Sequence, residues 1–122
     1  MDLNYLDFDY REDADGVGTF DAMASVAPAQ IAALHAEICA VLTWAHQHWP
    51  DACAPLEEGG AWHYDLQGVQ EISTPLLLDF DETSGQLCTA AGNPAAPRTS
   101  ITLTISGGAD FCAALREAFG LE

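Results

Sequence analysis

The sequence predicts a two-layer α+β domain, in which an antiparallel sheet of about five or six strands carries two helices on one face. Several segments alternate apolar and polar residues with a period of two, as strands with one solvated face do. Two other segments carry apolar residues at helical spacing, and each needs a partner surface on which to bury them. The 122 residues amount to one domain, and no shift of composition divides residues 1–122.

The N-terminal part is predicted to be a hairpin followed by a long helix. Residues 3–10 alternate apolar side chains with aspartates, and after a polar turn a second strand is expected at about 17–26. Pro28 then opens a segment whose apolar residues recur at i, i+3 and i+4 spacing as far as Trp49. Because Pro50 cannot continue a helix, the helix is expected to end there.

The C-terminal part is predicted to hold the remaining strands and a second helix, which Asp110 caps at its start and Gly120 ends. The element order is then β-β-α-β-β-β-β-α, with one strand fewer if the shortest does not form. These strands are expected at about 61–73, 76–81, 86–89 and 99–106. The predicted core consists of Trp62, Tyr64, Leu66, Leu78, Phe80, Ile101, Leu103 and Ile105 from the strands, and Ile31, Leu34, Ile38, Leu42, Leu115 and Phe119 from the helices.

The charge balance narrows the choice of partner. Nineteen acidic residues stand against three arginines, without any lysine, and the formal net charge is −16. Such a chain repels nucleic acids and anionic membranes, so we expect neither as a partner, whereas a basic protein or a cation is favoured. No secretory signal and no membrane-length apolar stretch is seen, so a cytoplasmic location is expected. The absence of lysine, with abundant Ala, Gly and Asp, favours a bacterial origin.

Two Asp-Phe-Asp segments are the first candidate site. Asp7 and Asp9 share one strand face, and Asp79 and Asp81 share another. If the two strands were neighbours, the four carboxylates would form a cluster that could bind a divalent cation or a basic partner. The competing interpretation is a hydrated polar face, and strand order decides between them.

His63 and Asp65 are the second candidate, because residues two apart on a strand lie on one face and could act as a general acid and base. No motif that activates a nucleophile or binds a nucleotide accompanies them. The four cysteines follow no zinc spacing and are expected to be thiols. No cofactor is therefore expected, with a divalent cation as the weaker alternative. His35, Cys39 and His46 lie along one helix edge, and a zinc site there would need a further ligand, such as His63 or Cys112, which the sequence does not place.

Trp44 is the third candidate, since the helical pattern places it nearly opposite the apolar stripe. An exposed Trp is a common anchor of protein interfaces, although a neighbouring loop could also cover it. Three functions remain open. The first is a non-catalytic protein-binding domain, such as an inhibitor, an immunity protein or a regulator, that uses an acidic sheet face. The second is a divalent-cation binder, and the third is a small enzyme built around His63 and Asp65.

Overall fold

The computed structural model describes residues 3–121 and confirms the α+β class and the predicted order of elements. Six strands and two α-helices lie within this range, together with two single 3₁₀ turns at 28–30 and 56–58. The elements are β1 (Asp9–Glu12), β2 (Gly18–Val26), α1 (Ile31–His48), β3 (Trp62–Glu71), β4 (Leu76–Asp81), β5 (Gln86–Ala91), β6 (Arg98–Gly107) and α2 (Ala109–Phe119).

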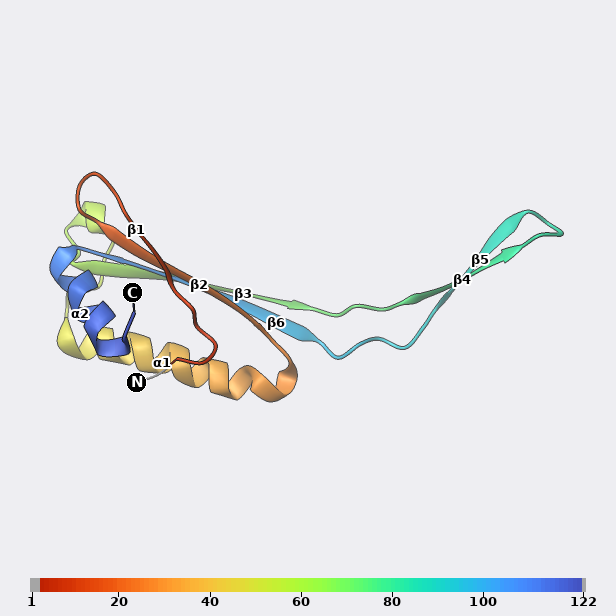
Figure 1. Cartoon of the computed structure of the whole chain (residues 1–122), viewed down its shortest axis with the longest axis horizontal. Helices are drawn as coiled ribbons and strands as arrows, with labels where there is room; N and C mark the ends of the chain where they lie inside the picture. Colours follow the sequence, from red (N-terminus) through yellow and green to blue (C-terminus); the bar gives the residue numbers. More distant parts are fainter. Residues whose placement is uncertain (1–2, 122) are drawn as a thin grey trace.

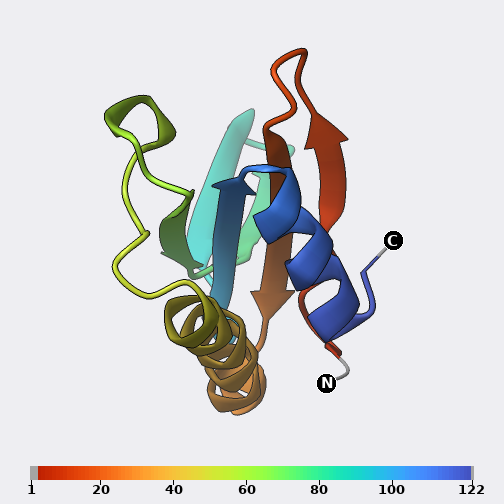
Figure 2. The same cartoon turned by 90° about the vertical axis from the view of Figure 1, so that its left-hand side faces the viewer.

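The six strands form two sheets. Strands β1, β2, β6 and β3 pair in that order to make a four-stranded antiparallel sheet, and β4 pairs only with β5. Both helices lie on the same side of the larger sheet, whereas β4 and β5 project far from it (Figures 1 and 2). Pro75, Pro94 and Pro97 lie between the two sheets. Because proline has no N–H to donate, the hydrogen-bond ladder is interrupted there.

The core lies between the helices and the inner face of the four-stranded sheet. Most predicted core positions are buried or packed against the core, but Leu66, Leu78 and Phe80 are 45%, 60% and 60% exposed. The prediction was wrong for these three, because strand periodicity identifies an apolar face without identifying what covers it. The largest fully buried side chains are Trp62, Phe20, Phe111, Leu34, Leu103, Ile105, Leu115 and Val41.

The N-terminal segment differs from the predicted strand. Strand β1 begins at Asp9 rather than at residue 3. The preceding residues are held instead by Glu37 of α1, whose carboxylate accepts hydrogen bonds from the backbone N–H groups of Asn4, Tyr5 and Leu6 at 2.9–3.1 Å. These bonds place the buried Leu6 side chain over the core. A long-range side-chain contact therefore replaces the expected ladder.

The second helix packs closely on the sheet. Its N-cap is Gly108 rather than the predicted Asp110, which lies in the first turn, and Gly120 ends the helix with φ = 64° as predicted. Gly18 and Gly107 pair across β2 and β6 beneath the helix. A Cβ on Gly18 would lie 2.6 Å from Cys112 Sγ, so the close approach requires glycine there.

No helix in the described part of the chain is long and apolar enough to cross a membrane.

Candidate functional site

Residues 72–97 form a projecting β-hairpin, which we call the arm. It comprises β4, β5 and the two segments that link them to β3 and β6. Nearly every residue of the arm is exposed. Two backbone hydrogen bonds, from Gly92 N–H to Pro75 O and from Ala95 N–H to Ser73 O, each 2.8 Å long, connect the two linking segments. The arm is therefore a continuation of the β3–β6 ribbon beyond the body of the protein (Figure 1).

The arm has two chemically different faces. Residues directly opposite each other in an antiparallel pair share a face, and Leu78 is opposite Thr89 while Phe80 is opposite Leu87. The face that contains these residues, which we call the apolar arm face, has no charged side chain. The other face carries Asp79 and Asp81 near the tip. The apolar arm face consists of Leu76, Leu78, Phe80, Leu87, Thr89 and Ala91.

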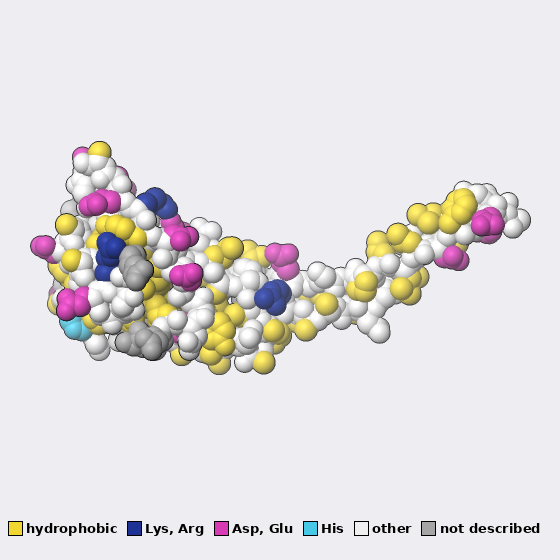
Figure 3. Space-filling model, viewed as in Figure 1, with side chains coloured by type: hydrophobic (Ala, Val, Ile, Leu, Met, Phe, Trp, Pro, Cys, Tyr) yellow, Lys and Arg dark blue, Asp and Glu magenta, His cyan; other side chains and the backbone are white. Residues whose placement is uncertain are grey.

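This apolar surface is unusual for a solvated hairpin. The four large side chains Leu76, Leu78, Phe80 and Leu87 are 59–60% exposed. Hydrophobic side chains lie along the length of the projecting arm (Figure 3). A two-stranded hairpin without a further layer is at best marginally stable in water. Contiguous exposed apolar patches of this kind mark interaction surfaces. The arm therefore carries an exposed apolar patch on one of its two faces.

Charged residues are absent from most of the arm. Segments 72–78 and 83–97 contain no Asp, Glu, Lys or Arg, although the whole chain carries 22 such residues. The arm's three charges, on Asp79, Asp81 and Glu82, lie at or beside its tip. Depletion of charge is typical of the centre of a protein interface.

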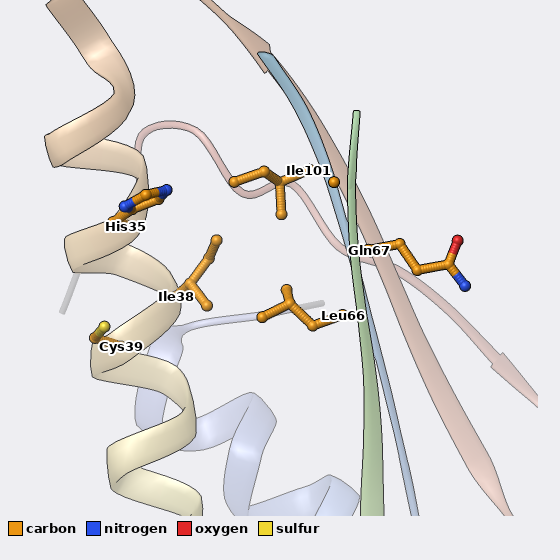
Figure 4. Close-up of a pocket in the computed structure, with 7 residues that line it drawn as sticks. His35, Ile38, Cys39, Leu66, Gln67 and Ile101 are labelled. Carbon is orange, nitrogen blue, oxygen red and sulfur yellow. The ribbon is translucent and has the colours of Figure 1, made fainter. Parts of the chain in front are cut away.

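An apolar groove lies in the body beside the base of the arm. It has a volume of about 460 Å³ and runs between α1 and the inner face of β3 and β6. Leu66 and Ile101 point toward α1 across this groove, while the Gln67 side chain points away from it (Figure 4). The lining contains no carboxylate and no Lys or Arg. The residues are His35, Ile38, Cys39, Leu66, Gln67, Gly68 and Ile101.

Strand β3 has one unpaired edge. It lies at the end of the four-stranded sheet and pairs only with β6, apart from a single bridge between Trp62 and Cys53. The backbone from His63 to Glu71 therefore has a neighbouring strand on one side only within the described residues. An exposed edge of this length can accept another strand.

The four aspartates of the predicted cluster lie apart. Asp7 precedes β1, which carries Asp9 and pairs with β2, whereas Asp79 and Asp81 lie on β4 in the other sheet. The strands are not neighbours, so the four-carboxylate cluster does not form. Asp81 has a local role instead. The Thr83 N–H donates to it at 2.9 Å, and this bond, with those from Ser84, lowers the pKa of the Asp81 carboxyl.

No group of three or more His, Cys, Asp or Glu within residues 3–121 is placed to hold a metal ion. The helix positions His35, Cys39 and His46 are all exposed, and no further ligand joins them. All four cysteines are free thiols. Burial raises the pKa of the Cys112 thiol, so this thiol stays protonated at neutral pH.

His63 and Asp65 lie on the face of the sheet away from the helices, which we call the open sheet face. Both are exposed, and Asp65 accepts a 2.9 Å hydrogen bond from Gln67 Nε2. His63 lines a shallow hollow of about 240 Å³ together with Glu57 and Ser106. The general acid–base role predicted for His63 and Asp65 stays a prediction.

The open sheet face is mixed rather than uniformly acidic. Arg11 forms an ion pair with Asp21, and Arg98 donates hydrogen bonds to Ser25. Thr104 donates to Asp21 at 2.7 Å, and this bond, assisted by Arg11, lowers the pKa of the Asp21 carboxyl. Asp9, Asp65 and Glu71 are the other acidic residues of this face.

The Trp44 side chain is not fully exposed to solvent. It is half-buried, with its ring centroid 6.2 Å from that of Phe111 and 5.8 Å from that of Phe119, both on α2. The helical pattern correctly placed it off the main stripe, but α2 covers this second flank of α1. Trp44 is therefore mainly a packing residue between the two helices.

The exposure of the large apolar side chains of the arm does not follow from the sequence pattern. Ile72, Leu76, Leu77 and Leu87 all lie within predicted strands, but none of them was predicted to be exposed. The signals that mark them are the long uncharged segments and the prolines on both sides of the hairpin.

No protein-family model matches the chain, and searches of the curated proteins and of the solved structures found no significant match.

Proposed function

We propose that this chain is a non-catalytic protein-binding domain, of the kind used by inhibitors, immunity proteins or regulators, and that the arm is its binding element. The observation that carries the proposal is the apolar arm face, on which four large side chains are 59–60% exposed. Covering them with protein removes apolar area from water, which is the main driving force of association. A hairpin with one apolar face and one free edge can also add a strand to a partner sheet.

To test the proposal, the chain is immobilised and the proteins that it retains from a cell extract are identified. The cells that supply the extract also make an untagged copy of the same chain. The double variant Leu78→Asp/Phe80→Asp places two charges on the apolar arm face. The control is Met23→Asp, which changes a large apolar residue on the open sheet face that is 69% exposed. We expect the native chain and the control to retain the same protein and the double variant to lose it. Equal retention by all three would contradict the proposal.

A basic partner on the open sheet face is a second candidate. The net charge of −16 and the positions of Asp9, Asp65 and Glu71 on an uncovered face support it. Salt separates the two candidates, because screening weakens contacts between exposed charges and strengthens apolar ones. Partner release at high sodium chloride, together with loss of binding in Asp9→Asn/Asp65→Asn, would favour the open sheet face. Retention at high salt favours the arm.

A further inference from the structure

The unpaired edges of β3 and β4 match in length and direction. The two strands follow each other along the chain, separated only by residues 72–75. A two-fold axis through this link therefore places β4 of one copy antiparallel to β3 of another. Strand β3 has ten residues, of which Trp62 is occupied by its bridge to Cys53, and β4 has six. The unpaired part of β3 is thus long enough for the whole of β4.

The side-chain pattern also matches. The inward residues of β3, including Leu66 and Gly68, have even numbers, as do Leu76, Leu78 and Phe80 of the apolar arm face. Since strand faces alternate with a period of two, any register that pairs even with even residues turns the apolar arm face toward α1. Asp79 and Asp81 then lie on the solvated side of the extended sheet.

The groove lies where this pairing would bring the apolar arm face. It opens between α1 and the inner side of β3 beside Leu66 and Gly68, and its volume is about 460 Å³. Leucine and phenylalanine side chains from the apolar arm face would fill it and cover the exposed Leu66. The apolar arm face and the lining of the groove are both apolar and uncharged, so each would cover the apolar surface of the other.

Net charge restricts where two copies can meet. Each chain carries −16, so two chains repel each other over most of their surface. The apolar arm face and the groove are free of carboxylates, so the contact on the inner side brings no like charges together. On the outer side of the joined strands, Asp79 and Asp81 of one copy come near Asp65 of the other. A specific interface of standard size buries about 1,600 Å² in total, and the two-fold axis supplies the contact between arm and groove twice.

We propose that the partner of the arm is a second copy of this chain, and that two copies exchange arms about a two-fold axis near residue 72. This inference rests on the proposed protein-binding function, because it names the partner of the same surface. Each arm adds β4 and β5 to the β3 edge of the other copy and covers its groove. Each half of the dimer then has one six-stranded antiparallel sheet, with β4 and β5 contributed by the other chain.

Molar mass in solution is the first test. Size-exclusion chromatography with light scattering should give twice the monomer mass of 13.0 kDa for the native chain. The double variant Leu78→Asp/Phe80→Asp should elute as the monomer, and Met23→Asp should remain a dimer. Added sodium chloride should strengthen the dimer, because it screens the repulsion between two acidic chains. Circular dichroism checks that the variants keep their fold.

The second test locates the contact by cross-linking thiols. Cys39 lines the groove and is exposed. Thr89 lies on the apolar arm face opposite Leu78, whereas Cys88 lies on the other face opposite Asp79. In Cys88→Ser/Thr89→Cys, we expect a flexible bis-maleimide to join Cys39 of one copy to the thiol that Thr89→Cys introduces in the other. The product should double in mass on a denaturing gel, and the further change Cys39→Ser should abolish this link. Products that contain only links between identical positions would overturn the arm-in-groove arrangement.

Failure of the inference can be told from failure of the proposed function. A monomeric native chain at high protein concentration would overturn the exchange of arms, whether the arm folds back on its own β3 or stays open. The proposed function would still stand if the immobilised chain retained a different protein through its arm. If Leu78→Asp/Phe80→Asp still forms the dimer, the exchange of arms is overturned. If the immobilised variant also retains as much partner protein as the native chain does, the proposed function is overturned as well.

Discussion

Glu37 shows how a single side chain can fix a segment that lacks secondary structure. Among residues 3–121 it is the one charged side chain buried in the core, at 5% exposure. Its carboxylate accepts hydrogen bonds from three successive backbone N–H groups, which would otherwise be left without partners close to the core. The negative charge is thus compensated by backbone dipoles rather than by a cation.

The variant Glu37→Ala should therefore destabilise the protein by about 2–4 kcal/mol, because three backbone donors lose their acceptor and a small cavity is left. Urea unfolding measures the change. Glu117→Ala is the matched control, since this exposed glutamate lies on α2, and it should alter the free energy of unfolding by less than about 0.5 kcal/mol. Equal effects of the two variants would show that the N-terminal segment contributes nothing to stability.

Asp21 connects three strands through its side chain and gives the protein a pH-dependent contribution to stability. The hydrogen bond from Thr104, assisted by Arg11, holds the pKa of Asp21 below its ordinary value of 3.8. A carboxyl group with a lowered pKa stabilises the folded state above that ordinary value. The contribution is lost as the pH falls through the lower pKa of the folded protein.

Thr104→Val should thus lower the free energy of unfolding by about 1 kcal/mol at pH 7. The difference from the native chain should shrink as the pH is lowered below 3.8. Thr102→Val, two residues earlier on the same face of β6, serves as the control and should show no such pH dependence. Thermal unfolding between pH 2 and 7 makes the comparison, and a constant difference across this range would contradict the assignment.

At the scale of the elements, the packing of α2 depends on two glycines that face each other across β2 and β6. The Gly107 position lies against the ring of Phe111, and Gly18 lies beneath Cys112 and Tyr10. The Phe111 ring in turn stacks on that of Trp62 at a centroid distance of 5.4 Å. A methyl group at Gly107 would have to displace this aromatic stack or lift the helix.

Gly107→Ala should consequently cost about 1–3 kcal/mol through overpacking. Gly68→Ala is the control, because its added Cβ would meet Ile101 at an ordinary 3.8 Å, and the free energy of unfolding should change little. Both variants should be unfolded at the same low protein concentration and followed by tryptophan fluorescence. If Gly107→Ala is no less stable than Gly68→Ala, close packing of α2 on this position is not required.

Periodicity in the sequence was sufficient for the elements but not for their assembly. The alternating patterns of β3, β4 and β6 and the helical stripe of α1 were correctly identified, because local sterics and one buried face determine them. The pattern of Leu76, Leu78 and Phe80 is the same whether a helix, a second copy or water lies against it. The carboxylate cluster failed for the same reason, since strand order depends on contacts remote in sequence.

At the scale of the whole molecule, we expect the folded body to be stable without the arm. The buried residues all lie outside the arm, so the body's core does not depend on it. The backbone groups of Ser73 and Ala95 are joined by a 2.8 Å hydrogen bond at the base of the arm. A short turn can therefore replace everything beyond this point without breaking the β3–β6 ladder.

Replacing residues 74–94 by Asn-Gly, a dipeptide suited to a tight hairpin turn, should leave a folded body. Its unfolding midpoint should not depend on protein concentration, whereas that of the native chain should rise with concentration, because association stabilises the folded state by mass action. At the lowest concentrations the two midpoints should converge, since the isolated arm adds no core to the body. If the variant without the arm is unfolded, the arm stabilises its own body. If the unfolding midpoints of both proteins rise with protein concentration in the same way, the association takes place on another surface.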